Sequence, residues 1–208
     1  MGTYFENLDD MQLDALKEIG NIGAGNAATA LSRMVGKRVS MAVPLVRILP
    51  LKEVPDWLGG PEKEVLGVYL TMSGAVTGHI LFVMTIDNAL KLMKILLGNM
   101  APEKEQILEM DEIASSAMNE IGNILSSSYL SALADFTGLR LSHSVPAMAV
   151  DMAGAIVDLV LIEIARRGDH ALLIETEFVE EENRIQGFFM LIPDSTSLEV
   201  ILQAIGVN

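Results

Sequence analysis

The sequence contains no cysteine, and its basic residues are few and scattered. Without cysteine, disulfide bonds, thiolate metal ligands and a thiol nucleophile are excluded. Lysine and arginine together number 14 against 28 acidic residues, so the net charge is −14. Nucleic acids and anionic membrane surfaces are bound through clustered positive charge, so neither is expected as a partner.

The sequence also lacks an uninterrupted apolar run. Residues 65–86 have about the length of a membrane-spanning helix, but they include three glycines, Ser73, Thr77 and His79. These breaks favour two β-strands around a turn, so membrane insertion is not expected. Residues 1–10 lack the basic and apolar regions of a signal peptide, which makes the cytoplasm the expected location.

The sequence contains an internal repeat. The pentapeptide Glu-Ile-Gly-Asn-Ile begins at Glu18 and again at Glu120. When residues 18–44 are aligned without gaps to residues 120–146, 12 of 27 positions are identical. The match predicts an internal duplication. We expect a single domain over residues 1–208, made of two repeats at about 8–100 and 109–208 and related by a pseudo-two-fold axis.

Each repeat is expected to contain a long helix, a strand with a proline, a strand pair and a closing helix. The expected ranges are 8–35, 38–49, 65–72, 76–86 and 87–98, then 109–136, 140–150, 170–179, 184–192 and 195–206. Between strand and strand pair, the first repeat has a loop around residues 55–61, and the second has an additional amphipathic helix within 149–168. The predicted fold is α/β, more narrowly α+β: a two-layer duplicated domain with a continuous, largely antiparallel sheet and two long helices.

A narrow polar stripe runs along each long helix. At about 100° of rotation per residue, Asp14, Glu18 and Asn21 share one face with Gly25, opposite a broad apolar face. The second helix carries Ser116, Glu120, Asn123 and Ser127 at the same positions. A solvated face is the alternative interpretation, but such a face tolerates almost any polar residue, whereas both copies keep Glu and Asn.

Glycine and asparagine on this stripe favour contact with a partner molecule. Asparagine is a mediocre helix former, and Gly25 costs about 1 kcal/mol relative to alanine without packing in return. Gly20 and Gly122 lie on the apolar face, where we expect a close crossing against the sheet or the sister helix. The glycine-rich residues 20–25 are a weak match to a phosphate-binding loop, because they lie inside a helical pattern and follow no strand.

The residue types restrict the chemistry of the stripe. His79, His143 and His170 have no catalytic motif around them, and we expect them to be surface or strand residues. A single glutamate per stripe is too few ligands for a protein-held metal. A carboxamide can hold a water in line for attack on a phosphoryl group, with a carboxylate one turn away docking to a cation of the partner.

These residues resemble the CheC phosphatase family of bacterial chemotaxis, which also includes CheX and FliY. The family pattern is Asp or Ser, Glu and Asn at fixed spacing, followed by a proline. It occurs twice, as Asp14-Glu18-Asn21-Pro44 and as Ser116-Glu120-Asn123-Pro146. Two intact motifs favour a CheC-type over a CheX-type protein, and we do not expect the peptide-binding tail and C-terminal switch domain that FliY-type proteins usually add.

The resemblance implies a phosphatase of the aspartyl phosphate of CheY. Asn21 and Asn123 would position the attacking water, and Glu18 and Glu120 would pair with the lysine of CheY. Asp14, Ser116, Pro44 and Pro146 would support them, while the Mg²⁺ ion would belong to CheY. The resemblance also implies binding to the receptor deamidase CheD, which we assign to the additional helix with Asp151; the alternative is that this helix only covers the sheet. The alternative is a non-catalytic adaptor that binds CheD or the flagellar switch; a small-molecule enzyme is a third possibility.

Overall fold

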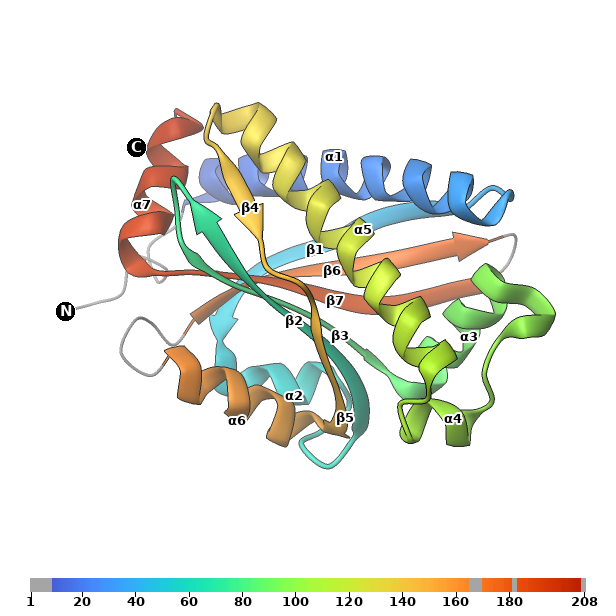
Figure 1. Ribbon diagram of the computed structural model, residues 1–208. Helices are drawn as coiled ribbons and strands as arrows, with labels where there is room; N and C mark the ends of the chain where they lie inside the picture. Colours follow the sequence, from blue (N-terminus) through green and yellow to red (C-terminus); the bar gives the residue numbers. More distant parts are fainter. Residues whose placement is uncertain (1–8, 165–169, 181–182, 207–208) are drawn as a thin grey trace.

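Two 26-residue helices, α1 (Asp10–Val35) and α5 (Glu112–Thr137), lie on one face of a β-sheet (Figure 1). The computed structural model describes residues 9–164, 170–180 and 183–206. After α1 the chain forms β1 (Ser40–Pro50), η2 (Leu51–Glu53), α2 (Val54–Trp57), β2 (Glu64–Gly74), β3 (Gly78–Thr85) and α3 (Ile86–Leu97). A connection with η3 (Gly98–Met100) and α4 (Lys104–Leu108) leads to α5, β4 (Leu141–His143), β5 (Ala147–Met152), α6 (Ala153–Ile164), β6 (His170–Glu180), β7 (Asn183–Pro193) and α7 (Ser195–Ala204).

Both long helices begin and end at residues that satisfy their terminal backbone groups. Asp9 forms a capping box with Gln12, in which its carboxylate accepts from the Gln12 backbone N–H at 2.8 Å. Asp111 caps α5 in the same way, accepting from a backbone N–H three residues further on at 2.7 Å. Gly36 and Gly138 end the helices with φ of 66° and 70°, which glycine adopts without strain.

The sheet exchanges strands between the two halves of the chain. Its order is β1-β6-β7-β3-β2-β4, with β5 also paired to β2, and the pairings are antiparallel. The first strand of each half therefore lies beside the hairpin of the other half, and β3 and β7 meet in the middle. This order confirms the predicted continuous, largely antiparallel sheet, and its symmetry is compatible with the predicted pseudo-two-fold arrangement.

The two long helices cross each other closely at a glycine. A Cβ atom added at Gly23 would lie 2.6 Å from Cδ1 and 3.0 Å from Cα of Tyr129, distances that no real Cβ tolerates without a shift. Tyr129 itself is buried and stacks on Phe189 of β7, with 4.2 Å between ring centroids. Helix–helix and helix–sheet packing thus meet at this crossing, inside the largest apolar cluster.

Gly20 and Gly122, expected at a close crossing, contact the sheet side of the core. A Cβ at Gly20 would meet Val43 and Ile174 at an ordinary 3.7 Å. At Gly122 it would lie 2.6 Å from Cγ1 of Val68. The two repeat-equivalent glycines therefore differ, because α5 approaches the sheet more closely here than α1 does.

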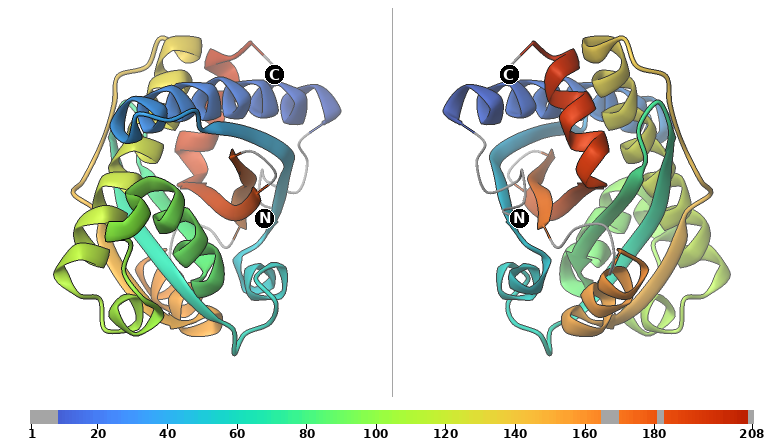
Figure 2. Two further views of the ribbon diagram at one scale, coloured as in Figure 1. Left: turned by 90° about the vertical axis from the view of Figure 1, so that its right-hand side faces the viewer. Right: turned by 90° about the vertical axis from the view of Figure 1, so that its left-hand side faces the viewer.

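Short helices cover part of the opposite face of the sheet. A second apolar cluster joins η2, α2 and α6 to side chains of the strands, and it includes Leu51, Val54, Ile156 and Val160. Figures 1 and 2 show α2 and α6 across the sheet from α1 and α5. The two predicted layers are therefore supplemented by a partial third layer.

Three segments differ from the sequence-based expectations. The strand predicted over 140–150 is interrupted at residues 144–146, between β4 and β5. The additional helix predicted within 149–168 begins only at Ala153, because the preceding residues pair with β2 as the end of β5. The predicted loop around 55–61 contains the single helical turn α2 at its start. Residues 165–168 of that predicted helix, and residues 181–182, lie outside the described residues.

Candidate functional site

The stripe on α1 is open to solvent. The side chains of Asp14, Glu18 and Asn21 are exposed, as predicted from their positions on the helix. One turn further on, a Cβ atom added at Gly25 would meet no described atom within 4 Å. The surface around the Asn21 carboxamide is therefore flat enough for another molecule to approach the helix closely.

The stripe on α5 is arranged in the same way but is less exposed. Ser116 and Glu120 are exposed, and Asn123 is half-buried. Within the described part of the chain, the glutamate and asparagine side chains of both stripes form no hydrogen bond or ion pair. Their polar atoms are therefore available to a partner and are not engaged by the protein's own backbone.

The two motif prolines occupy different positions relative to the helices. Pro44 is exposed and lies at an irregularity in the pairing of β1 with β6, between Ala42 and Leu45. Proline fits there because it has no N–H to donate to the ladder. Pro146 is half-buried between β4 and β5, and its Cγ atom would be 3.8 Å from a Cβ at Gly122. Only Pro146 is thus shown to pack beside its motif helix.

A serine–histidine pair adjoins the second stripe and was not predicted as part of the site. Ser127 Oγ lies 2.9 Å from Nε2 of His143, whose Nδ1 lies 2.9 Å from the carbonyl oxygen of Ser144. Because a carbonyl only accepts, Nδ1 carries the hydrogen and Nε2 accepts from the Ser127 hydroxyl. The repeat offset of 102 aligns Ser127 with Gly25 and His143 with Met41. The replacement of two residues without polar side-chain groups by a serine and a histidine was the sequence signal that could have revealed the pair.

The structure also places the histidines and the glycine-rich segment that the sequence raised as alternative candidates. His79 and His143 lie in strands, as expected, with His79 2.6 Å from the Tyr69 hydroxyl; the His170 side chain is outside the described residues. The glycine-rich residues 20–25 lie inside α1. Among the residues placed by the structure, no three His, Asp or Glu side chains gather as metal ligands. Of the described helices, none is both long and apolar enough to cross a membrane.

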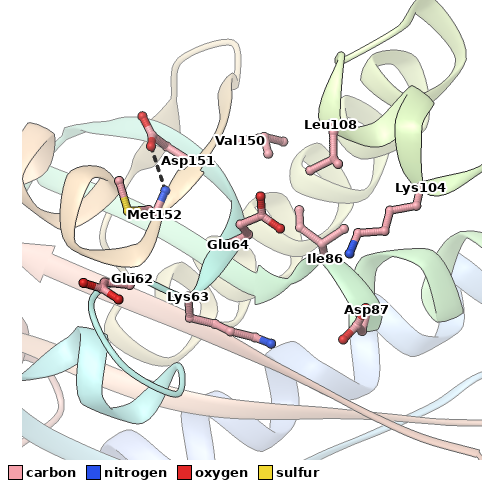
Figure 3. Close-up of a pocket in the computed structure, with 10 residues that line it drawn as sticks. All are labelled: Glu62, Lys63, Glu64, Ile86, Asp87, Lys104, Leu108, Val150, Asp151 and Met152. Atoms are coloured by element: carbon pink, nitrogen blue, oxygen red, sulfur yellow. Dashed lines mark hydrogen bonds between the residues drawn. The ribbon is translucent and has the colours of Figure 1, made fainter.

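Asp151 lies in β5, not in the additional helix to which it was assigned. It pairs with Val65 of β2, and its carboxylate accepts from the backbone N–H of Met152 at 2.7 Å. It is exposed at one end of a cleft of about 780 Å³, with Lys104 and Asp87 at the other end (Figure 3). The assignment was wrong in element but close in space, because α6 begins two residues later.

Comparison with known proteins identifies the family. The model of the CheC-like family matches residues 11–48 and 113–149, one segment around each stripe. The CheY-P phosphatase CheC of Bacillus subtilis (strain 168) is 35% identical over 208 residues, which cover 99% of this chain and 99% of that protein. The chain belongs to the CheC-like family.

Two FliY proteins extend the comparison. The flagellar motor switch phosphatase FliY of Bacillus subtilis (strain 168) is 27% identical over 141 residues, 68% of this chain and 36% of that protein. The crystal structure of Thermotoga maritima FliY superimposes with a TM-score of 0.77 at 20% identity, covering 95% of this chain and 97% of that chain. The latter similarity establishes a shared fold.

Proposed function

We propose that this chain hydrolyses the aspartyl phosphate of phosphorylated CheY, using the stripes of α1 and α5 as two sites. Membership of the CheC-like family supports this, together with 35% identity over the full chain to a protein named as a CheY-P phosphatase. The observation that carries the proposal is geometric: on both helices a carboxylate and a carboxamide lie one turn apart, at least partly exposed, and neither has a hydrogen-bond or ion-pair partner among the described residues.

Asn21 and Asn123 position the attacking water. A carboxamide offers both a donor and an acceptor, so it can fix the orientation of a water molecule opposite the P–O bond that breaks. The water oxygen bonds to phosphorus, the bond to the aspartate oxygen of CheY breaks, and inorganic phosphate and a free carboxylate result. Charge on the phosphoryl group is balanced by the Mg²⁺ ion of CheY, so this chain supplies mainly geometry.

Glu18 and Glu120 fix the register of the complex. Each lies three residues before its asparagine, about 4.5 Å along the helix axis, so a lysine bound to the carboxylate places the phosphoryl group near the carboxamide. Asp14 and Ser116 extend the contact by one more turn. The proposed cytoplasmic location follows from the proposed partner and remains a prediction.

The experiment is hydrolysis of phosphorylated CheY by the double variant Asn21→Ala, Asn123→Ala. We expect a loss of about 100-fold or more in turnover, since the water loses its positioning group at both sites. The matched control is Asn26→Ala, because Asn26 is exposed on α1 but lies outside the stripe. Wild-type turnover by the double variant would overturn the site assignment.

The same assay separates catalysis from the adaptor alternative. An adaptor binds phosphorylated CheY, CheD or the flagellar switch without accelerating phosphate release. If the wild-type chain binds phosphorylated CheY but leaves its decay rate unchanged, the phosphatase proposal fails and the adaptor remains.

A second part of the proposal is binding to CheD at β5 and α6. Asp151 is exposed there, and the same two elements expose three apolar side chains, which are 49%, 57% and 72% exposed: Met152, Leu159 and Ile162. Exposed apolar side chains on elements that also carry a carboxylate are compatible with a protein–protein contact. Asp151→Lys should weaken binding of purified CheD at least tenfold by calorimetry, whereas Asp135→Lys, on the other side of the sheet, should not. Equal affinities would refute the assignment.

A further inference from the structure

An apolar groove of about 480 Å³ lies directly beside the second stripe. Its lining comes from three helices that are distant in sequence, and Ser116 and Glu120 of the stripe form part of its edge. Met34 at the end of α1 and Ile113 at the start of α5 line it while being 43% and 51% exposed. The groove and the proposed phosphatase site are therefore one continuous surface.

The repeat carries the same kind of residues to the first stripe. The offset of 102 aligns Ile113 with Met11 and Met34 with Phe136, and these two are 67% and 46% exposed. Large exposed apolar side chains at equivalent places in both copies are not needed for the core. At the start of each helix, before its stripe, lies an exposed apolar residue, Met11 on α1 and Ile113 on α5. Equivalent apolar residues lie at the ends of the two helices, Met34 on α1 and Phe136 on α5.

The charges at the edge restrict what the groove accepts. The ionisable residues that line it are Glu112 and Glu120, and the described lining includes neither lysine nor arginine. An apolar side chain that enters the groove must therefore come from a surface that is locally basic.

We propose that this groove binds an apolar side chain of phosphorylated CheY that lies beside the basic residue meeting Glu120. The inference rests on the proposed function and adds a second contact to it. Glu120 and Asn123 align the phosphoryl group, and the groove supplies binding energy by removing apolar surface from water. This contact acts on formation of the complex and hence on KM, not on the chemical step.

The test uses the Asn21→Ala chain, in which only the second stripe keeps its asparagine. Met34→Ser in this background should raise KM for phosphorylated CheY about tenfold and leave kcat within about twofold. The matched control is Met100→Ser, since Met100 is 73% exposed on η3 and does not line the groove. Ile113→Ser is the second groove variant, and thermal melting checks that each variant is folded.

The outcomes are distinguishable. If the wild-type chain shows no turnover, the proposed function fails. If it turns over but Met34→Ser, Ile113→Ser and Met100→Ser share one KM, only the groove proposal is overturned. A third outcome is that the sedimentation coefficient depends on chain concentration differently in the groove variants than in the wild type, while KM stays constant. A second copy of this chain then occupies the groove, and the proposal is again wrong.

Discussion

The two halves of the chain present nearly the same helix to solvent but support it differently. Both carry glutamate and asparagine one turn apart, yet the residue one turn after the asparagine is Gly25 on α1 and Ser127, bonded to His143, on α5. Inside the protein, Ala27 corresponds to Tyr129, which fills the space where the helices cross. The comparison shows that the exposed stripe is the shared element, and that the packing beneath it has diverged.

The largest expected effect tests whether the two sites work independently. Asn123→Ala leaves the first site and Asn21→Ala leaves the second, so each single variant should retain part of the turnover. Because no hydrogen bond or ion pair joins the described side chains of one stripe to those of the other, the two residual rates should add up to the wild-type rate. Initial rates of phosphate release measure this; complete loss in either single variant would show that one site depends on the other.

Alanine substitutions at the two repeat-equivalent glycines should change the free energy of unfolding by different amounts. Gly122→Ala brings a methyl group against Val68 and should lower the free energy of unfolding by about 1–3 kcal/mol. Gly20→Ala meets only ordinary contacts and gains helix propensity, so it should be neutral or stabilising by up to about 1 kcal/mol. Urea denaturation compares the pair; equal costs would mean that α1 and α5 approach the sheet equally closely.

Tyr129→Phe tests the interaction present in the second half alone. Burial raises the pKa of Tyr129 to about 12, while its hydrogen bond with Thr176 acts in the opposite direction, so the hydroxyl stays protonated at neutral pH. Removing it should cost about 1 kcal/mol of stability. In a double-mutant cycle, adding Thr176→Val should cost less than it does in the wild type. Strict additivity would show that the 3.0 Å contact contributes nothing.

The smallest effect concerns the caps of the closing helices, Thr85 for α3 and Asp194 for α7. Partial burial acts to raise the pKa of Asp194, but hydrogen bonds, first that from Thr77, lower it to about 2. The folded pKa lies below the ordinary aspartate value of 3.8, so this stabilisation is complete above about pH 4 and is lost as the pH falls towards 2. Asp194→Asn keeps a side chain that caps helices but removes the group that titrates. The melting temperature of this variant should therefore depend less on pH between pH 4 and 2 than that of the wild type. An unchanged pH dependence would contradict the assignment.

The long helices and their stripes were predictable because their signals are local. The 3.6-residue period lies within a single helix, and the repeat shows it twice. The break between β4 and β5 was not predictable in this way. Pro44 and Pro146 are equivalent in sequence, yet β1 continues through an irregularity whereas the second strand stops and restarts. The outcome depends on the partner strands β6 and β2, which lie far away in sequence.

The start of α6 and the apolar groove were missed for the same reason. Residues 149–152 have a pattern compatible with a helix, but pairing with β2 holds them in a strand. Met34, Leu97 and Ile113 belong to three helices, and only the fold brings them together. The serine–histidine pair joins α5 to β4 across a turn, which motif spacing alone does not reveal.

The exchange of strands within the sheet has a consequence for ancestry and assembly. Neither half can satisfy the backbone groups of its own hairpin edge, because the neighbouring strand there is supplied by the other half. A gene encoding a single unit would therefore produce a molecule that completes its architecture by pairing with an identical copy. Fusion of two such genes turns an intermolecular partnership into an intramolecular one, and frees each unit to specialise.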